Sequence, residues 1–231
     1  PGYTNGYLSN IAKVCACSSG FAFLTKNGKV NTCGTYYVAV GQNLIKTKFT
    51  TPSSLLSTSS TVDIAATDQC FIALKPNGSV VLWGDPLMVT PFNNINPVPS
   101  TSSISSIATT RNAVALLSTT GEVYTSGFYF DNNYSQITVT TPVGLTNVKR
   151  VYTSESAFAA LTNSGEVVVW GDPMSGGSNI NDNYFNTLTS SYRNSYTGKG
   201  NNLKNIIDIV PTRRAFLAIK SDNTVSVWGD T

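Results

Sequence analysis

The sequence predicts an all-β protein, a β-propeller built from five repeated blades of about four antiparallel strands. Three observations lead to this fold: a hairpin pattern that recurs every 43 to 58 residues, richness in Ser, Thr and Asn, and a charged fraction of only 12%. Three or four short strands per repeat of this length are typical of propeller blades. One such unit cannot bury both faces of its sheet, whereas units packed around an axis can.

The repeat is anchored on a turn glycine, with apolar residues at fixed offsets before and after it. The anchors are Gly28, Gly78, Gly121 and Gly165, with Asn223 in the fifth copy. Seven residues before each anchor lie Phe21, Phe71, Val114, Phe158 and Phe216. We expect one domain over residues 1–231, with repeat cores near 10–35, 61–86, 104–128, 148–173 and 206–230.

Each copy is expected to form a strand, a short loop, a second strand, a tight turn and a third strand. The second strand is almost continuously apolar, as in Phe158–Thr162, which indicates burial on both faces. The turn residues suit a hairpin, because Gly and Asn accept positive φ. A fourth strand would fall in the variable segment that follows the third.

The composition excludes several classes of function. Histidine is absent from the sequence, which removes His-based zinc sites and His-dependent triads. The net charge of +3 comes without a dense Lys/Arg run, which argues against nucleic acid as a partner. No apolar run approaches the ~20 residues of a membrane span. We therefore expect a non-enzymatic protein with no catalytic residue, no cofactor and no metal.

Four cysteines leave two interpretations open. They are Cys15, Cys17, Cys33 and Cys70. Free cysteine is among the most buried residue types, which favours small core residues. A disulfide is the alternative, and spacing does not identify its partners.

The hairpin pattern, apolar-Ala-Leu followed by Gly, Val and Trp-Gly, resembles the regulator of chromosome condensation repeat, here in a divergent form with Trp-Gly-Asp. The resemblance covers Ile11 to Asp230 and implies a propeller, usually closed with seven blades. Family repeats commonly carry a Gly three residues ahead of a His. Here the Gly position is Cys17, Thr67, Thr110, Ser154 and Thr212, and the His position is Gly20, Cys70, Ala113, Ala157 and Ala215.

Five hairpins are compatible with two arrangements. In the first, the chain closes as a five-bladed ring, and residues 1–10 complete the blade begun by the last hairpin, since closure removes exposed sheet edges. In the second, the chain is part of a seven-bladed ring.

Two sets of repeated residues are interpreted as structural. Trp83, Trp170 and Trp228 are equivalent, and we expect them to pack between blades with the indole N–H bonded to a neighbouring backbone. Asp85, Asp172 and Asp230 follow them, and we expect each carboxylate to cap the turn that leaves the strand.

A third set alternates in charge from copy to copy, ten residues before each anchor. After Ser18 it comprises Asp68, Arg111, Glu155 and Arg213. The same loop of successive blades would carry these residues, so we expect a charged ring on one face, with Asp68–Arg111 and Glu155–Arg213 able to pair.

The variable loops are the candidate partner-binding surface. Tyr and Arg among small polar residues form a composition that binding surfaces favour. The loops 172–202 and 128–136 supply the candidates Tyr129, Tyr134, Tyr184, Phe185, Tyr192, Arg193 and Tyr196.

Two hypotheses of function follow. The first is a structural or interaction module that binds a protein or glycan, as part of a surface, appendage or virion assembly, and so lies outside the cell or on its surface. The second is a small-GTPase regulator, which the family resemblance alone implies.

Overall fold

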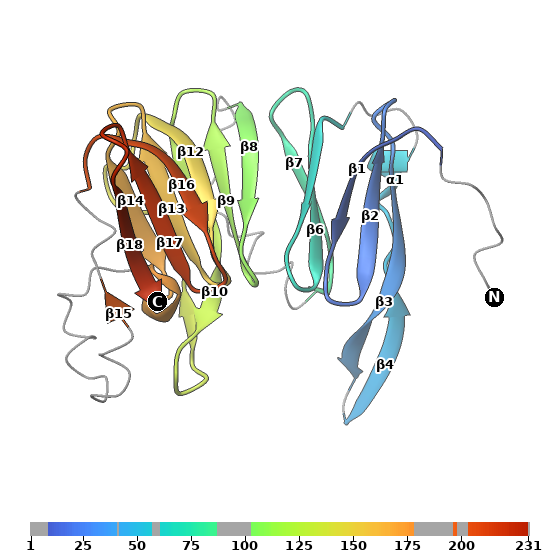
Figure 1. The fold of residues 1–231 in the computed structure, drawn as a ribbon. Helices are drawn as coiled ribbons and strands as arrows, with labels where there is room; N and C mark the ends of the chain where they lie inside the picture. The colour runs from blue at the N-terminus through green and yellow to red at the C-terminus, as the bar shows by residue number, and fades with distance from the viewer. Residues whose placement is uncertain are drawn as a thin grey trace. The chain divides into compact units, whose positions relative to one another are not determined.

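The computed structural model describes residues 9–40, 42–56, 61–86, 103–177, 196–197 and 203–230. The chain divides into two compact units, Pro1–Thr90 and Pro91–Thr231. The described residues form five antiparallel sheets of three or four strands, with two sheets in the first unit and three in the second (Figure 1). We call these sheets blades 1 to 5 in chain order.

The first unit contains blades 1 and 2. Blade 1 has the strand order β1 (Ile11–Ala16), β2 (Gly20–Thr25), β3 (Val30–Val40) and β4 (Asn43–Lys48). The single-turn helix α1 (Ser53–Leu56) follows it. Blade 2 consists of β5 (Asp63–Ala66), β6 (Cys70–Leu74) and β7 (Val80–Gly84).

The second unit contains blades 3 to 5. Blade 3 consists of β8 (Ile104–Thr109), β9 (Ala113–Ser118), β10 (Val123–Phe130) and β11 (Gln136–Thr138). Blade 4 consists of β12 (Val148–Thr153), β13 (Ala157–Thr162) and β14 (Val167–Gly171), followed by the 3-10 turn η1 (Pro173–Ser175). Blade 5 consists of β16 (Ile206–Pro211), β17 (Ala215–Lys220) and β18 (Val225–Asp230), with β15 (Tyr196–Thr197) beside β18.

The strand β15 shows how the outer edge of blade 5 is made. Tyr196 pairs with Asp230 and Thr197 with Gly229, so the segment between blades 4 and 5 contributes this edge over two residues. The sequence had suggested residues 1–10 for this edge. Residues 1–8 lie outside the described residues.

In the second unit, two anchor glycines join one blade to the next. Gly121 and Gly165 have φ of 84° and 77°, which glycine adopts without strain. Their carbonyl oxygens accept the N–H of Val148 and of Ile206, the first residues of the following blades, at 2.9 Å each. A Cβ on Gly165 would lie 3.1 Å from the carbonyl oxygen of Ile206. The hairpin glycine therefore serves both the turn and the contact between blades.

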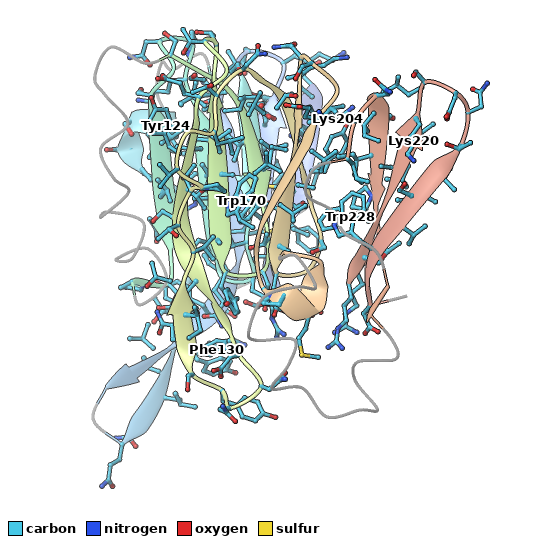
Figure 2. The ribbon with its side chains drawn as sticks, turned by 90° about the vertical axis from the view of Figure 1, so that its left-hand side faces the viewer. Tyr124, Phe130, Trp170, Lys204, Lys220 and Trp228 are labelled. Carbon is cyan, nitrogen blue, oxygen red and sulfur yellow. The ribbon has the colours of Figure 1, made fainter. Side chains whose placement is uncertain are left out.

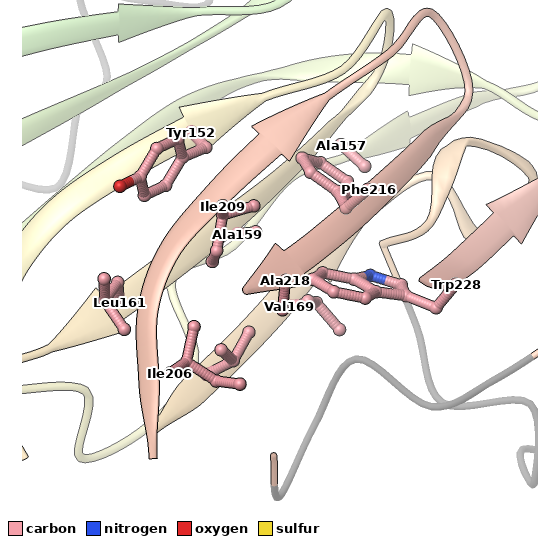
Figure 3. Packing of buried hydrophobic residues seen from close by; sticks show 11 residues of the cluster. Tyr152, Ala157, Ala159, Leu161, Val169, Ile206, Ile209, Phe216, Ala218 and Trp228 are labelled. Atoms are coloured by element: carbon pink, nitrogen blue, oxygen red, sulfur yellow. The ribbon is translucent and has the colours of Figure 1, made fainter. Parts of the chain in front are cut away.

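The core lies between blades, where an aromatic pair from one blade packs on the previous one. Phe216 and Trp228 stack at 5.3 Å between ring centroids and lie against Ala159, Leu161 and other apolar residues of blade 4 (Figure 3). Phe158 and Trp170 stack in the same way, at 5.1 Å, in the cluster with blade 3. In the first unit, Phe71 and Trp83 lie 5.6 Å apart in the cluster with blade 1.

A β-bulge recurs near the start of the first strand. The pairing register shifts between Ile11 and Lys13, and equivalently in the three blades of the second unit. Bulges redirect the residues that follow them. In two blades, a residue that follows the bulge forms a polar contact with the next blade. Lys13 Nζ lies 2.5 Å from Asp63 Oδ1, and the Tyr152 hydroxyl donates to Asp208 Oδ1 at 2.5 Å.

The architecture confirms the predicted fold class: the described residues form five blades of antiparallel strands at the predicted repeats. The single domain over 1–231 stays a prediction, as does the choice between a closed ring and part of a larger one. All four cysteines are free thiols, of which Cys70 is buried. Of the helices in the described ranges, none has the length and apolar character that crossing a membrane requires.

Candidate functional site on the loop face of blades 3 to 5

The loops between first and second strands emerge at the same end of the sheet as the loops that follow the third strands, because adjacent strands are antiparallel. In the second unit, we call this end the loop face. It consists of Thr110–Asn112, Ser154–Ser156, Thr212–Arg214, Asp131–Ser135 and Asp172–Gly177.

A hydroxyl holds each of the short loops. Thr110, Ser154 and Thr212 accept the N–H of the residue three positions later, at 3.0, 3.2 and 2.9 Å. These residues occupy the position where the family repeat commonly carries Gly. The residue they bond is an alanine packed against a glycine of the third strand: a Cβ on Gly171 would lie 2.9 Å from Ala157 Cα. The third-strand glycine position therefore has no room for a side chain.

The loop tips are joined from blade to blade by main-chain hydrogen bonds. The Arg111 N–H donates to the carbonyl oxygen of Glu155 at 2.8 Å, and the Glu155 N–H donates to that of Arg213 at 2.7 Å. In the first unit, the Ser18 N–H donates to Asp68 in the same way, at 2.9 Å. The backbone thus places the side chains of this repeat position next to one another.

Glu155 is the centre of an arginine cluster. Arg213 binds it with two hydrogen bonds, Nε to Oε2 at 3.0 Å and Nη2 to Oε1 at 2.9 Å. Arg214 Nε lies 3.5 Å from Oε2, and Arg111 Nη1 lies 3.7 Å from Oε1. Arg214 also approaches the carboxylate of Asp230, at 3.7 Å. The hydrogen bond from Arg213 holds the pKa of Glu155 below its ordinary value, although partial burial opposes the shift.

A hollow of about 470 Å³ opens beside the cluster, lined by all three arginines and by Phe130, Tyr134 and Met174. Tyr134 is 87% exposed and Phe130 48% exposed, so both offer aromatic surface to solvent. Phe130 precedes, and Tyr134 lies within, a turn in which Asp131 accepts the N–H groups of Asn133 and Ser135, at 2.9 and 2.8 Å. Figure 2 shows Phe130 at the opposite end of the ribbon from Lys204.

Asp172 closes another side of the hollow. Its carboxylate accepts the Met174 N–H at 3.0 Å and the Ser175 hydroxyl at 2.7 Å, which caps η1. Burial raises the pKa of Asp172, an effect that these two hydrogen bonds partly offset. Asp85 is buried, with 3% of its surface exposed, and Asp230 faces Arg214.

The remaining residues that the sequence predicted to be structural or partner-binding lie in different environments. The Trp228 indole N–H donates to the carbonyl oxygen of Gly176 at 3.2 Å, whereas those of Trp83 and Trp170 have no partner among the described residues. Tyr129 packs against the core cluster of blades 3 and 4 rather than lining the hollow. Tyr184, Phe185, Tyr192 and Arg193 lie outside the described residues, and Tyr196 lies in β15.

Sequence reasoning missed Arg214 and Phe130 as parts of this site. Arg214 directly follows Arg213, a residue of the alternating set. This Arg-Arg sequence was a signal from which Arg214 could have been predicted as part of the site. It also missed a second alternating set, fifteen residues before each anchor. That set is Lys13, Asp63, Ser106, Arg150 and Asp208.

The described residues contain no group of three or more His, Cys, Asp or Glu side chains that would hold a metal ion.

Comparison with known proteins agrees with this architecture. No family model matches the chain. A mouse protein described as an RCC1-like G exchanging factor-like protein is 29% identical over 183 residues, which are 67% of this chain and 39% of that protein. Yeast RCC1 (Prp20), solved in complex with Kap60, superimposes with a TM-score of 0.58 at 18% identity, over 95% of this chain and 56% of Prp20.

A second structure of Prp20p, from Saccharomyces cerevisiae, gives a TM-score of 0.55 at 15% identity, over 95% of this chain and 58% of that one. That work concerns its binding to Gsp1p and histones. The chain thus spans between two fifths and three fifths of the length of these relatives.

The chain has the fold of a β-propeller protein. Its sequence is similar to that of the RCC1-like mouse protein, and its fold is similar to that of yeast RCC1.

Proposed function

We propose that this chain is a non-enzymatic interaction module that binds an acidic segment of a partner protein on its loop face. The observation that carries the proposal is the convergence of Arg111, Arg213 and Arg214 on Glu155 beside a hollow with exposed aromatic walls.

The charge balance of the cluster favours an anionic ligand. Three guanidinium groups face two carboxylates, those of Glu155 and Asp230. Each guanidinium carries five N–H donors in a planar fork, which suits a carboxylate. The cluster therefore keeps a net positive charge and more donors than its own carboxylates can use.

The other acids that line the hollow do not cancel this preference. The Asp131 and Asp172 carboxylates accept hydrogen bonds within their own turns. Beside the Asp131 turn, the hollow is lined by Tyr134 and Phe130, whose aromatic surface would pack on apolar residues next to the acidic side chains of a partner.

The test measures binding of a fluorescent peptide made of Glu and Tyr residues, compared with a peptide in which Gln replaces Glu. We expect Arg213→Gln with Arg214→Gln to weaken binding of the acidic peptide about tenfold, ~1.4 kcal/mol. Glu155→Gln should strengthen it several-fold, because the competing carboxylate is removed. Affinity should fall as salt is added.

Lys204→Gln is the matched control. It removes one exposed cation paired with Glu166 at 3.9 Å, away from the loop face (Figure 2). Equal losses for Lys204→Gln and for the arginine variant, or equal binding of the two peptides, would contradict the proposal.

A second candidate is regulation of a small GTPase, because the mouse relative is described as a G exchanging factor-like protein. The direct test is the release of fluorescent GDP from small GTPases with and without the chain. Accelerated release that the arginine variant abolishes would favour this candidate and would place a GTPase on the loop face. Release at the intrinsic rate across a panel of GTPases would count against it.

A glycan partner, and a place in a surface, appendage or virion assembly, stay predictions from composition. Glycan-array binding by the chain, unaffected by the arginine variant, would favour a glycan over an acidic peptide.

A further inference from the structure

We propose that the acidic segment bound on the loop face is extended and adds as a strand to β10, with acidic and apolar side chains alternating along it. This inference rests on the proposed function and adds the conformation and the residue order of the partner segment. Two observations carry it: β10 ends in a strand edge that no other described strand covers, and one face of that edge is turned to the arginine cluster.

The edge arises because β10 continues beyond the end of its neighbour β9. Residues 123–127 of β10 pair with β9, whereas residues 128–130 pair with β11 alone (Figure 1). The side of residues 128–130 that faces away from β11 is therefore a strand edge, which we call the inner edge. No other described strand pairs with it. Unpaired edges of this kind are templates to which an extended segment adds as a further strand.

Hydrogen bonds on the two sides of β10 indicate which main-chain groups lie on the inner edge. The Phe128 N–H donates inward, to the carbonyl oxygen of Asn112 at 3.0 Å. The Asp131 N–H donates to the carbonyl oxygen of Ser135 at 3.0 Å, on the β11 side. Because the main-chain groups of successive strand residues point to alternate sides, the N–H and the carbonyl oxygen of Phe130 lie on the inner edge. Phe130 also lines the hollow, so a segment in the hollow reaches these two groups.

The two faces of β10 at this edge have different surroundings. Tyr129 packs in the cluster that blade 3 shares with blade 4, so its face is turned to blade 4. The Phe130 side chain lies on the opposite face, next to Phe128 at 5.3 Å between ring centroids. A strand added at the inner edge continues both of these faces.

Pairing with Phe130 fixes the direction of each side chain in the added segment. The residue opposite Phe130 takes the face of Phe130 and packs beside its ring, which is 48% exposed. The residues before and after it take the face of Tyr129, which is turned to blade 4. There, Arg111 and Arg213 converge on Glu155. Acidic residues therefore suit the two flanking positions and an apolar residue suits the central one, which gives the order acidic-apolar-acidic.

The first experiment compares two fluorescent peptides of one composition, the alternating peptide Gly-Glu-Tyr-Glu-Gly and the adjacent peptide Gly-Tyr-Glu-Glu-Gly. We expect the wild type to bind the alternating peptide about tenfold more tightly, because only that order turns both carboxylates to the arginines. Methylation of the Tyr nitrogen in the alternating peptide should weaken binding about fivefold, since it removes the hydrogen bond to the carbonyl oxygen of Phe130. Methylation of the following Glu nitrogen is the matched control, because that N–H points away from β10 and should leave the affinity unchanged.

The second experiment removes a hydrogen-bond donor from the protein. Phe130→Pro deletes the N–H on the inner edge, a place where strands tolerate proline, and Phe130→Leu keeps this N–H and controls for the ring. Gln136→Pro deletes an N–H on the outer edge of β11, because Gln136 stands opposite Phe130 in the ladder. We expect Phe130→Pro to weaken binding of the alternating peptide about fivefold more than Phe130→Leu does. Gln136→Pro should leave binding unchanged, and far-ultraviolet circular dichroism verifies that each variant is folded.

Equal binding of the two peptides that still requires Arg213 and Arg214 would overturn the added strand and leave the proposed binding of an acidic segment intact. Equal losses from methylation of the Tyr and the Glu nitrogen would overturn it as well, and this result does not depend on the folding of Phe130→Pro. Absence of binding to every Glu-containing peptide would instead overturn the proposed function, and the added strand with it.

Discussion

Blades 1 and 4 share one repeat but bury it to different extents. Phe158 of blade 4 is fully buried and stacks on Trp170, whereas Phe21 of blade 1 is 49% exposed and pairs with Cys33. Both phenylalanines stand at the same register of the second strand. The strand thus sets where the side chain points, and the neighbouring blade decides whether it is buried.

The loops of blades 1 and 4 differ in the same way in the contacts of their polar groups. In blade 1, Ser18 donates its N–H and its hydroxyl to the carbonyl oxygen of Asp68. In blade 4, Glu155 occupies the same repeat position, keeps the main-chain bond and adds a pair with Arg213. The main-chain contact belongs to the repeat, while the charged contact depends on the residue that each copy carries.

The largest difference is expected from truncating the two phenylalanines. Phe158→Ala should lower the free energy of unfolding by about 3–5 kcal/mol, because it opens a cavity against blade 3. Phe21→Ala should cost only about 1 kcal/mol, since half of its side chain already contacts water. Urea unfolding of both variants at low protein concentration measures the difference, and equal losses would break the comparison.

The turn position gives the next largest effect. Gly165→Asn copies the residue of the fifth repeat, and we expect a loss of about 1–2 kcal/mol because the new Cβ meets the backbone of Ile206. Asn223→Gly should change stability by only a few tenths of a kcal/mol, since Asn223 is exposed and both residues accept its φ of 67°.

Thermal unfolding compares these two reciprocal exchanges. If Gly165→Asn is as mild as Asn223→Gly, the close approach of the next blade is not what selects glycine at this turn.

The next largest difference in stability is expected between variants that remove the two polar links between the first strands of neighbouring blades. Tyr152→Phe removes a hydrogen bond to the Asp208 carboxylate and should cost about 1.5 kcal/mol. Lys13→Met removes an ion pair whose side chains are 47% and 30% exposed, and such pairs contribute ~0–1 kcal/mol. Chemical denaturation of the two variants decides whether the partly buried hydrogen bond between Tyr152 and Asp208 is the stronger link.

Alkaline pH offers an independent measure of the Tyr152 link. Burial, followed by the hydrogen bond to Asp208, raises the pKa of Tyr152 to about 12. A raised pKa favours the protonated folded state, so the stabilisation is complete below the ordinary tyrosine pKa of about 10. It is lost as the pH rises through about 12. The ultraviolet absorbance titration of the wild type should contain a late-titrating tyrosine that Tyr152→Phe removes.

The smallest effect is expected at Glu155. Arg213 holds its pKa below the ordinary value, so Glu155 stabilises the fold above the unfolded-state pKa and loses this effect as the pH falls through the folded-state pKa. Glu155→Gln should therefore cost up to ~1 kcal/mol at neutral pH. The difference from wild type should vanish in acid, which unfolding curves at several pH values measure. A difference independent of pH would assign the cost to packing instead.

Much of the fold could be predicted from the anchor glycines and the Phe and Val positions, because hairpin geometry and burial act locally and repeat in every copy. The site could be predicted only in part. The alternating set pointed to Arg111, Glu155 and Arg213, which share one loop position, but Tyr129 and Tyr134 looked equivalent in sequence. The strand β10 packs Tyr129 against the core cluster, and Tyr134 lies beyond the end of this strand.

The sequence by itself determined the blades, since local patterns of apolar residues, turn residues and small residues specify each hairpin. Only the tertiary structure decided which side chains meet. Arg214 reaches both Glu155 and Asp230 because the main chain joins the loop tips of blades 4 and 5. Phe21 stays exposed while Phe216 is buried, because burial between blades is a property of neighbours that no single repeat contains.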